Sequence, residues 1–338
     1  MMKQVVFWSI VFLPAVIACA LALLIAVAAY EVRIIMDAEA YARAGVRFQK
    51  LARWLHEMHR PIWQGQSHCI LFDEVLFYKP RPGKCEFNGI EYSTLLTFDS
   101  RGFRQTSPPM RQNDERPNRG RIIVLGDSQA MGWGVQDEET FASVLAAEHG
   151  FEVFNLAVSS YGTARELLRL QKEFELQKGD IVVIQYHHND LRENLTFLES
   201  GGLPRRSPSD LGLLAHTSPG YDVLQVSKSI AFFIVNRLKQ PLFTDSSRKS
   251  SRKPHAETFL TVIDHFPELA QAKVVVCEVP SYGQTTSFTG DLARLADGTI
   301  NVLKPVWETS DFYRLDEHMN ATGHRKLAHF IAATILSG

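Results

Sequence analysis

The longest apolar run of the chain lies close to its amino terminus. Residues 5–30 contain no charged side chain and are almost wholly apolar. These 26 residues exceed the ~20 that a helix needs to cross a hydrocarbon core about 30 Å thick. The pattern predicts a transmembrane anchor at 5–30, preceded by a cytoplasmic amino terminus at 1–4. A cleaved signal peptide is the alternative, because Ala26-Val27-Ala28 has the form of a cleavage site, although a signal core usually has only about 7–15 residues.

Apolar residues recur with helical spacing after this run. They predict an amphipathic stalk helix within residues 31–66, which ends near Pro61 and carries a basic face. Residues 67–120 break into short apolar runs between turn formers, which indicates small strands and a connecting loop. The apolar positions of the stalk helix are Phe48, Leu51, Leu55, Met58 and Ile62.

From residue 121 onward, compact apolar runs alternate with helical patterns. Such runs suit a parallel sheet that is covered on both faces. We therefore expect an α/β domain over 121–338, a three-layer sandwich with a mostly parallel five-stranded sheet. An insertion at about 197–256 holds one helix near Asp222–Lys239, and residues 201–255 carry nine Lys and Arg against three Asp. The predicted strands are 121–126, 151–158, 180–187 and 272–280, and the predicted helices are 139–148, 163–177 and the segment after Thr322.

Composition narrows the class of protein. The 338 residues include 36 Lys and Arg against 37 Asp and Glu, a net charge of −1. Without a strongly basic chain there is no reason to expect nucleic-acid binding. Four cysteines are too few for a disulfide-dense miniprotein, and the absence of a C-x-x-C pair disfavours a zinc ribbon or a thioredoxin-type centre.

Two of the cysteines bear on where the soluble part lies. Cys69 and Cys85 flank a stretch containing Pro and Gly that can bring them together. A disulfide there would contribute roughly 3 kcal/mol and needs an oxidising compartment; two unpaired thiols are the alternative. Lys3 favours a cytoplasmic amino terminus, whereas four basic residues within 31–50 favour the opposite orientation. Because long domains translocate largely regardless of charge, we expect a single-pass inner-membrane protein with its soluble domain in the periplasm or outside.

Three polar clusters are placed where they can carry chemistry. Gly126-Asp127-Ser128 follows the first predicted strand and can expose a serine hydroxyl in a tight turn; a helix N-cap is the alternative role of Ser128. Asn189 follows the third strand and can direct its amide N–H at an oxyanion, or it can form an Asx-turn. His318, with Asp316 two residues away, can act as a general base or lie in an exposed polar loop.

The order of these clusters resembles the SGNH (GDSL-like) hydrolases. Gly126-Asp127-Ser128 is similar to the first block of that family, His188-Asn189-Asp190 to its asparagine block, and Asp316-x-His318 to its last block; residues 99–104 also resemble a lead-in of bacterial members. The resemblance covers about residues 70–338 and implies a flavodoxin-like sheet. It further implies Ser128 as nucleophile, His318 as base and Asp316 as the acid behind it. The oxyanion hole implied by the resemblance consists of the Ser128 N–H, the Asn189 side chain and a backbone N–H at Gly162, with Ser160 as the alternative to Gly162.

Three features depart from the family pattern. His187 stands where the family usually has glycine, and Asp316 lies closer to the histidine than the family's acid usually does. The closer spacing resembles the branch that acts on O-acyl groups of bacterial polysaccharides. Counted from Asn155, the oxyanion glycine of the family falls at Ser160. Because glycine adopts positive φ most freely, we expect Gly162 rather than Ser160 to be the donor.

The expected function is that of a membrane-anchored acyl-ester hydrolase with a Ser-His-Asp triad, which acts on O-acyl groups of cell-envelope glycans and needs no metal or organic cofactor. One alternative is a polysaccharide O-acyltransferase, in which a sugar hydroxyl replaces water as acceptor. Another is a catalytically weak binding subunit of an envelope polysaccharide complex. The expected partners are an acylated carbohydrate or another ester substrate, the membrane through the N-terminal helix, and envelope polysaccharide machinery; nucleic acid is not expected.

Overall fold

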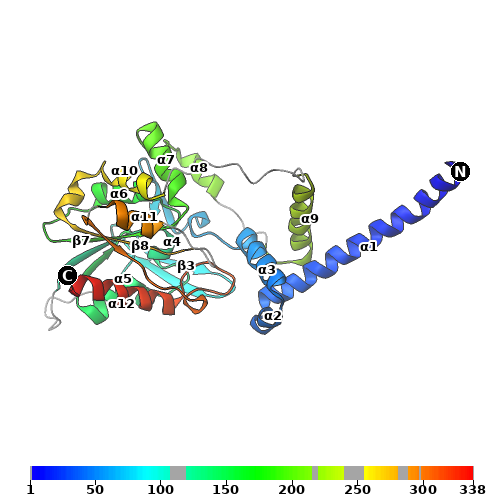
Figure 1. The fold of residues 1–338 in the computed structure, drawn as a ribbon, viewed down its shortest axis with the longest axis horizontal. Helices are drawn as coiled ribbons and strands as arrows, with labels where there is room; N and C mark the ends of the chain where they lie inside the picture. Colours follow the sequence, from blue (N-terminus) through cyan, green and yellow to red (C-terminus); the bar gives the residue numbers. More distant parts are fainter. Residues whose placement is uncertain are drawn as a thin grey trace. The chain divides into compact units, whose positions relative to one another are not determined.

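A computed structural model describes residues 2–106, 119–214, 220–239, 255–280, 288–296 and 298–337. The chain divides into two compact units (Figure 1). We call residues 1–60 with 218–250 the helical unit, and residues 61–217 with 251–338 the sheet unit. Each unit is described by itself below.

The sheet unit is built on five parallel strands in the order β6-β5-β7-β8-β9. This order places the first strand of the sheet, β5, between the second and the third, as in flavodoxin-like folds. β7 is buried at all of its positions and β5 at all but its first, because helices cover both faces of the sheet. The strands are β5 (Arg121–Leu125), β6 (Glu152–Asn155), β7 (Ile181–Tyr186), β8 (Lys273–Glu278) and β9 (Ile300–Leu303).

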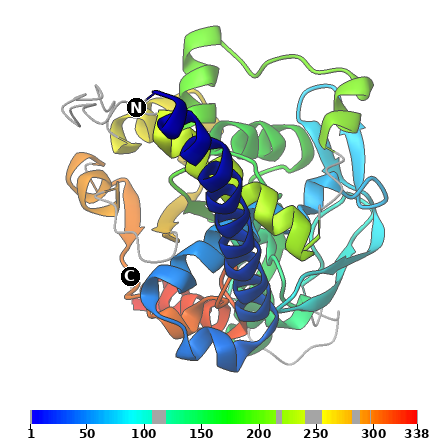
Figure 2. The same cartoon turned by 90° about the vertical axis from the view of Figure 1, so that its right-hand side faces the viewer.

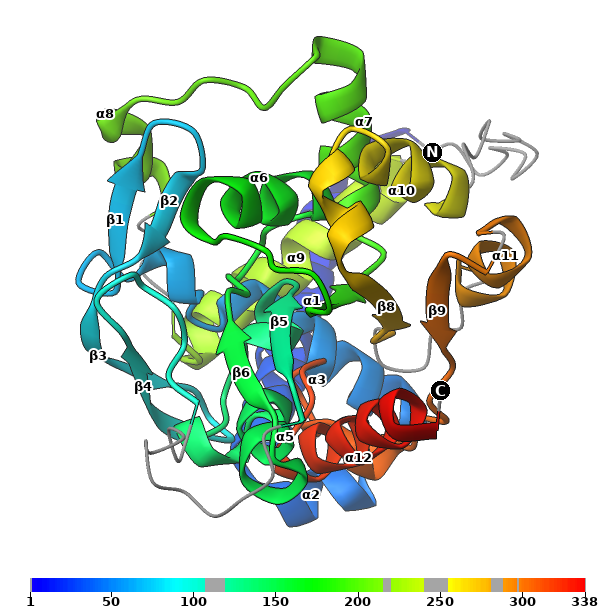
Figure 3. The same ribbon diagram turned by 90° about the vertical axis from the view of Figure 1, so that its left-hand side faces the viewer.

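Successive strand residues point into two separate apolar clusters, one on each face. Figure 3 shows α5 and α12 on one side of the sheet and α6 and α10 on the other. The expected three-layer α/β sandwich with a five-stranded sheet is therefore confirmed, and every strand pair is parallel. The covering helices are α5 (Phe141–His149), α6 (Thr163–Glu173), α7 (Asp190–Ser200), α10 (His255–Ile263), α11 (Phe288–Leu295) and α12 (Ala321–Ser337).

Some element boundaries differ from the prediction for local reasons. β6 stops at Asn155, whose side chain donates to Ala130 O at 3.0 Å and accepts from Ala157 N at 3.1 Å, so the predicted strand over 151–158 is too long. β9, a strand of four residues, was not among the strands predicted by position. The short elements of the sheet unit are α4 (Ser128–Met131), α8 (Pro208–Leu211) and the 3-10 turns Trp63–Gly65, Asp137–Glu139, Gly212–Leu214, Pro267–Gln271 and Thr309–Asp311.

The small strands expected before the sheet form two antiparallel hairpins. Cys69, directly before β1, is disulfide-bonded to Cys85 in β3, with the Cα atoms 5.3 Å apart. Because both cysteines are buried, the disulfide joins the two hairpins from inside. The hairpins are β1 (Ile70–Asp73) with β2 (Phe77–Pro80), and β3 (Gly83–Asn88) with β4 (Ser93–Phe98).

The helical unit contains α1 (Met2–Met36), α2 (Ala38–Arg43), α3 (Val46–His59) and α9 (Val223–Lys239). The apolar helix is longer than expected, and its part Phe12–Met36 has the length and hydropathy of a membrane span. The amphipathic helix expected within 31–66 and ending near Pro61 is present as α3, but it is shorter than that range. The residues before it form the end of α1 and a separate helix, α2, which starts where the Asp37 side chain accepts from two backbone N–H groups. Gly45 then precedes α3 in an extended conformation. The helix of the predicted insertion, α9, packs against α1 (Figure 2).

Candidate active site

A sharp turn at the end of β5 presents Ser128. Gly126 has φ +152°, and a Cβ there would lie 2.6 Å from Ala130 Cβ and 2.7 Å from Gln185 Oε1; only glycine fits this position. The buried Gln185 Oε1 accepts from Asp127 N at 3.3 Å and Ala130 N at 3.2 Å. Asp127, not Ser128, caps the helix by accepting from Gln129 N at 2.9 Å, so the serine hydroxyl is not used as a cap.

The structure brings Ser128, His318 and Asp316 together from positions far apart in the sequence. His318 Nε2 lies 2.7 Å from Ser128 Oγ. On the other side of the ring, His318 Nδ1 is hydrogen-bonded to Asp316 Oδ1. A carboxylate that accepts from Nδ1–H leaves Nε2 free to accept the serine proton. The exposed-loop alternative for His318 is wrong, since the ring is buried.

Two aromatic residues hold the second oxygen of the Asp316 carboxylate. Asp316 Oδ2 accepts from Trp133 Nε1 at 3.1 Å and from Tyr92 OH at 3.4 Å. The Trp133 indole also stacks on the His318 ring, with the centroids 4.5 Å apart and the planes 7° from parallel. The Asp316 carboxylate is thus oriented by two side chains that are far from it in the sequence, Trp133 and Tyr92.

The loop that carries Asp316 is held by Glu91. Its carboxylate accepts from three consecutive backbone groups, Arg314 N at 3.0 Å, Leu315 N at 2.7 Å and Asp316 N at 3.1 Å. Hydrogen bonds to a charged acceptor are the stronger kind, about 1.5–3 kcal/mol each. Glu91 therefore fixes the backbone of the acid from the neighbouring hairpin.

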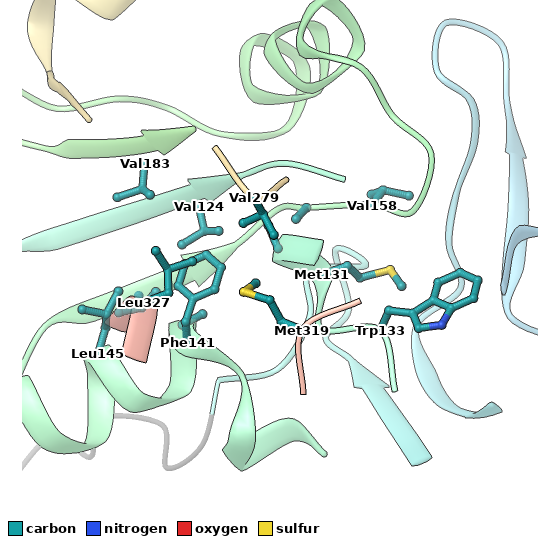
Figure 4. Close-up of a cluster of buried hydrophobic side chains, with 14 of the residues drawn as sticks. Val124, Met131, Trp133, Phe141, Leu145, Val158, Val183, Val279, Met319 and Leu327 are labelled. Carbon is teal, nitrogen blue, oxygen red and sulfur yellow. The ribbon is translucent and has the colours of Figure 1, made fainter. Parts of the chain in front are cut away.

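A second link joins the serine turn to the histidine loop. The Gln129 side chain donates to Glu317 O at 3.0 Å and accepts from Met319 N at 2.9 Å, so it brackets His318. Met131 and Met319 lie in the same apolar cluster (Figure 4). The two loops are therefore tied together by both hydrogen bonds and packing.

The turn after β6 contains both candidate backbone donors for the oxyanion, Gly162 and Ser160. Gly162 N–H donates to Glu193 Oε1 at 2.9 Å, so this N–H is occupied and the preference for Gly162 is not supported. Ser160 has φ +62°, the left-handed conformation that glycine takes most easily. Its side chain accepts from Gln64 Nε2 at 2.8 Å, and its N–H has no hydrogen-bond acceptor among the residues that the structure describes. Tyr78 OH steadies the turn by donating to Ser159 O at 2.6 Å.

Asn189 lies at the carboxyl edge of the sheet, directly before α7. Its strand, β7, is the hydrogen-bonded neighbour of β5, so Asn189 and Ser128 follow adjacent strand ends. The Asn189 side chain is exposed, and within the described ranges it caps no helix and has no hydrogen-bond partner. The structure thus places Asn189 on the same edge as the serine without a direct contact.

Buried carboxyl groups lie behind Asn189. Burial, together with the negative charge of Asp190, raises the pKa of Glu166 well above its ordinary value. Burial and the charge of Asp127 raise the pKa of Asp190 in the same way. Asp190 Oδ2 accepts from Thr163 Oγ1 at 3.0 Å, which connects the first turns of α6 and α7.

In the part of the chain that the structure describes, the groups of side chains that could share a metal ion do not include Ser128, His318 or Asp316. Within the described ranges, Glu148, His149 and His329 form one such group on α5 and α12, where His149 Nε2 lies 2.9 Å from His329 Nδ1. Another comprises His68 with Cys69 and Cys85, whose sulfurs are joined in the disulfide. Neither group includes a residue of the serine site, so we derive no step through a metal.

Several site residues were missed by sequence reasoning because no local motif marks them. All of them act through contacts with residues far away in the sequence. Trp133 stands near Ser128 in the sequence, and that proximity is the one signal that could have identified it as a site residue. The missed residues are Glu91, Tyr92, Gln129, Trp133 and Gln185.

Together, these features define a three-layer α/β protein with a serine–histidine–aspartate hydrogen-bond chain at the carboxyl edge of its sheet. No family model matches the chain, and no curated protein matches its sequence significantly. Solved structures that are similar to it include GDSL lipolytic proteins and carbohydrate esterases.

A lipolytic protein of the G-D-S-L family from Desulfitobacterium hafniense shares 13% identity at a TM-score of 0.39, over 63% of this chain and 98% of that one. A member of the same family from Veillonella parvula shares 12% identity at a TM-score of 0.37, over 64% and 98%. An acetylxylan esterase from Geobacillus stearothermophilus, solved as a catalytic mutant, shares 12% identity at a TM-score of 0.37, over 66% and 96%. The class of this protein therefore rests on its own strand order and site geometry.

Proposed function

We propose that the protein is a membrane-anchored acyl-ester hydrolase that uses a Ser128-His318-Asp316 triad. The observation that carries the proposal is the continuous hydrogen-bond chain: Ser128 Oγ lies 2.7 Å from His318 Nε2, and His318 Nδ1 is bonded to Asp316. This is the arrangement that nucleophilic acyl transfer requires. A catalytically weak binding subunit would not need it, which disfavours that alternative.

The reaction follows from the roles of these groups. Ser128 Oγ bonds to the ester carbonyl carbon while His318 Nε2 takes its proton, and Asp316 stabilises the resulting imidazolium. The alcohol then leaves with the proton from His318. Water attacks the acyl-serine with His318 again as base, which releases the carboxylic acid and restores Ser128. No metal or organic cofactor takes part in this scheme.

The oxyanion of each tetrahedral intermediate needs hydrogen-bond donors. We assign them to the N–H of Ser128, the N–H of Ser160 and the Asn189 side-chain amide. Ser128 opens α4, so its N–H has no acceptor within that helix. The Ser160 N–H replaces the expected Gly162 N–H because Gly162 donates to Glu193.

The substrate and location are proposed from separate features. The apolar span Phe12–Met36 supports an anchor, and the disulfide between Cys69 and Cys85 supports an oxidising compartment outside the cytoplasm. Together they support a single-pass inner-membrane protein with its sheet unit outside the cytoplasm. For that location we propose O-acylated glycans of the cell envelope as the substrates. The solved structures that are similar to the chain include carbohydrate esterases.

The test is covalent labelling and turnover of the full chain. A fluorophosphonate probe should label Ser128, and acetylated oligosaccharides should release acetate. Ser128→Ala should abolish both, and Ser143→Ala is the matched control because Ser143 bonds Asp137 O at the start of α5, within a different hydrogen-bond network. Absence of labelling and turnover in the parent chain would refute the proposal. Acetyl transfer to an added sugar acceptor that outpaces hydrolysis would establish the O-acyltransferase alternative instead.

A further inference from the structure

The second half of α9 begins with an apolar stretch that faces all sides of the helix, and it ends with Asn236, Arg237, Leu238 and Lys239. Its four consecutive residues Phe232, Phe233, Ile234 and Val235 are between 46% and 62% exposed; we call them the apolar tip. Successive residues of an α-helix are about 100° apart, so these side chains point in four directions. A protein that docks on one side of α9 would leave part of the apolar tip in water.

The amino-terminal half of α9 packs against the rest of the helical unit. Val226, Ser227 and Ile230 are buried, and α9 contacts α1. His59 of α3 is hydrogen-bonded to Gly220 O at 2.7 Å and to Ser229 Oγ at 2.9 Å. These contacts hold the start of α9 in place and leave the apolar tip projecting beyond them.

The exposure of apolar residues changes along α1, the helix that α9 packs against, and this change indicates which part of α1 lipid would surround. Its apolar residues before Leu24 that the structure describes are mostly half or more exposed, as expected for a helix surrounded by lipid. Further along, a stripe with spacings of three and four residues is partly or fully buried. The members of this stripe are Leu24, Val27, Ala28, Glu31, Ile34 and Ile35.

From this placement we infer that the apolar tip of α9 inserts into the lipid bilayer beside α1 as a second membrane contact. The inference rests on the proposed anchoring of α1. Trp54 of α3 packs on Phe233, with ring centroids 5.1 Å apart, and tryptophan favours the boundary between lipid and water. α9 itself carries Lys228, Arg237 and Lys239 and no acidic residue, and anionic headgroups attract such a positive charge. A lipid surface therefore satisfies both the circumferential apolar exposure and the charge.

The inference predicts a depth that can be measured in the full chain. Single cysteines are introduced in a Cys19→Ala background, labelled with the fluorophore NBD and reconstituted into vesicles of phosphatidylcholine with phosphatidylglycerol. Cys277 is buried and the other two cysteines form the disulfide, so the introduced cysteine reacts. Phe232→Cys and Val235→Cys report on the apolar tip. Leu21→Cys, in the exposed part of α1, is the reference for lipid, and Lys178→Cys, in an exposed turn of the sheet unit, is the reference for water.

Quenching by doxyl-labelled lipid at Phe232 and Val235 should lie within about twofold of that at Leu21, and iodide should quench only at Lys178. The inference is overturned if Leu21 is quenched by doxyl lipid while both tip positions are quenched by iodide. It is also overturned if the tip positions are protected from both quenchers in a way that depends on the protein-to-lipid ratio, since that would identify a second copy of the chain as the occupant. If Leu21 itself is not quenched by doxyl lipid, the proposed anchor fails and the inference fails with it.

Discussion

Replacing Asp316 by Asn tests the triad through the orientation of one side chain. The Asp316 carboxylate accepts from His318 on one oxygen and from Trp133 Nε1, at 3.1 Å, on the other. An indole N–H can only donate. The same N–H also donates to Tyr92 OH at 2.7 Å, and Tyr92 OH donates in turn to Asp316 Oδ2, so two donors face this side of the carboxylate. The asparagine oxygen is therefore expected to face Trp133 and Tyr92, and its NH₂ group to face His318 Nδ1. In that orientation the ring carries its proton on Nε2, which can no longer accept the proton of Ser128.

The size of the effect follows from the contacts that are lost. Restoring the productive tautomer would place two donors against each other and forfeit a hydrogen bond to a charged acceptor, at about 1.5–3 kcal/mol for the bond and about 1–3 kcal/mol for the unsatisfied donor. At about 1.4 kcal/mol per tenfold change in rate, Asp316→Asn should lower kcat by about 10²–10⁴. The upper end matches the serine-protease example of the same change. Folding should be largely unaffected because the shape of the side chain is kept.

The assay is ester turnover of the purified full chain, with circular dichroism as the check on folding. Asp311→Asn is the matched control: the Asp311 carboxylate is also buried, but it pairs with Lys326 Nζ at 2.8 Å and accepts from Glu308 N at 2.7 Å. Near-parent turnover in Asp316→Asn, together with loss of turnover in Asp311→Asn, would show that the acid is assigned wrongly.

A double variant tests the orientation argument itself. In Trp133→Phe the indole donor is gone, and Tyr92 OH, 3.4 Å from Asp316 Oδ2, can accept as well as donate. An asparagine at 316 can then direct its NH₂ at Tyr92 and its oxygen at His318. Trp133→Phe with Asp316→Asn should therefore be about tenfold more active than Asp316→Asn alone. A double variant that is as slow as the single one would contradict this reasoning.

Three further predictions concern positioning, pH and the disulfide. Glu91→Gln replaces one of the two acceptor oxygens by an NH₂ group that faces backbone N–H donors. We therefore expect kcat to fall about tenfold with a lower Tm, whereas the exposed control Glu86→Gln should match the parent; equal kcat values in both variants would contradict the role of Glu91. Burial raises the pKa of Glu166 well above its ordinary value of 4.5, so the folded chain holds this proton to a higher pH than the unfolded chain does. The free energy of unfolding should then fall, relative to Glu166→Gln, by up to ~1.4 kcal/mol per pH unit as pH rises; a difference in Tm that is constant from about pH 5 to pH 8 would refute the assignment. Non-reducing peptide mapping of protein from native membranes should find Cys69 linked to Cys85, and free thiols at both positions would exclude the disulfide. Replacing both residues, Cys69→Ser with Cys85→Ser, should lower the free energy of unfolding by roughly 3 kcal/mol.

The sheet was predictable because its signal is local. Strands such as β7 are runs of apolar residues that stay buried on both faces, and glycines such as Gly150, with φ +71°, end the helices between them. The helical unit was less predictable. The break at Asp37 depends on a side-chain cap, and the packing of α9 on α1 joins segments far apart in the sequence.

Within the candidate site, only the residues that stand in short sequence motifs were predictable. Ser128 and His318 stand in short motifs at fixed places relative to the strands, so their meeting follows from topology. Gly162 was preferred on conformational freedom, but the structure places Ser160 at φ +62° and gives the Gly162 N–H to Glu193. No pattern in the sequence shows that the Glu193 side chain of α7 accepts the hydrogen bond of the Gly162 N–H.

The hairpins before the sheet belong to the site rather than to a connecting segment. Glu91 and Tyr92 lie in the turn between β3 and β4, and they hold the backbone and the carboxylate of Asp316. The disulfide fixes β3 to the residue that precedes β1. Since the acid of the triad lies near the carboxyl terminus, its position depends on a part of the chain more than two hundred residues upstream. The part of the chain that holds the proposed triad therefore begins before β1, because a sheet that started at Arg121 would retain Ser128, His318 and Trp133 but lose Glu91 and Tyr92, which hold the backbone and the carboxylate of Asp316.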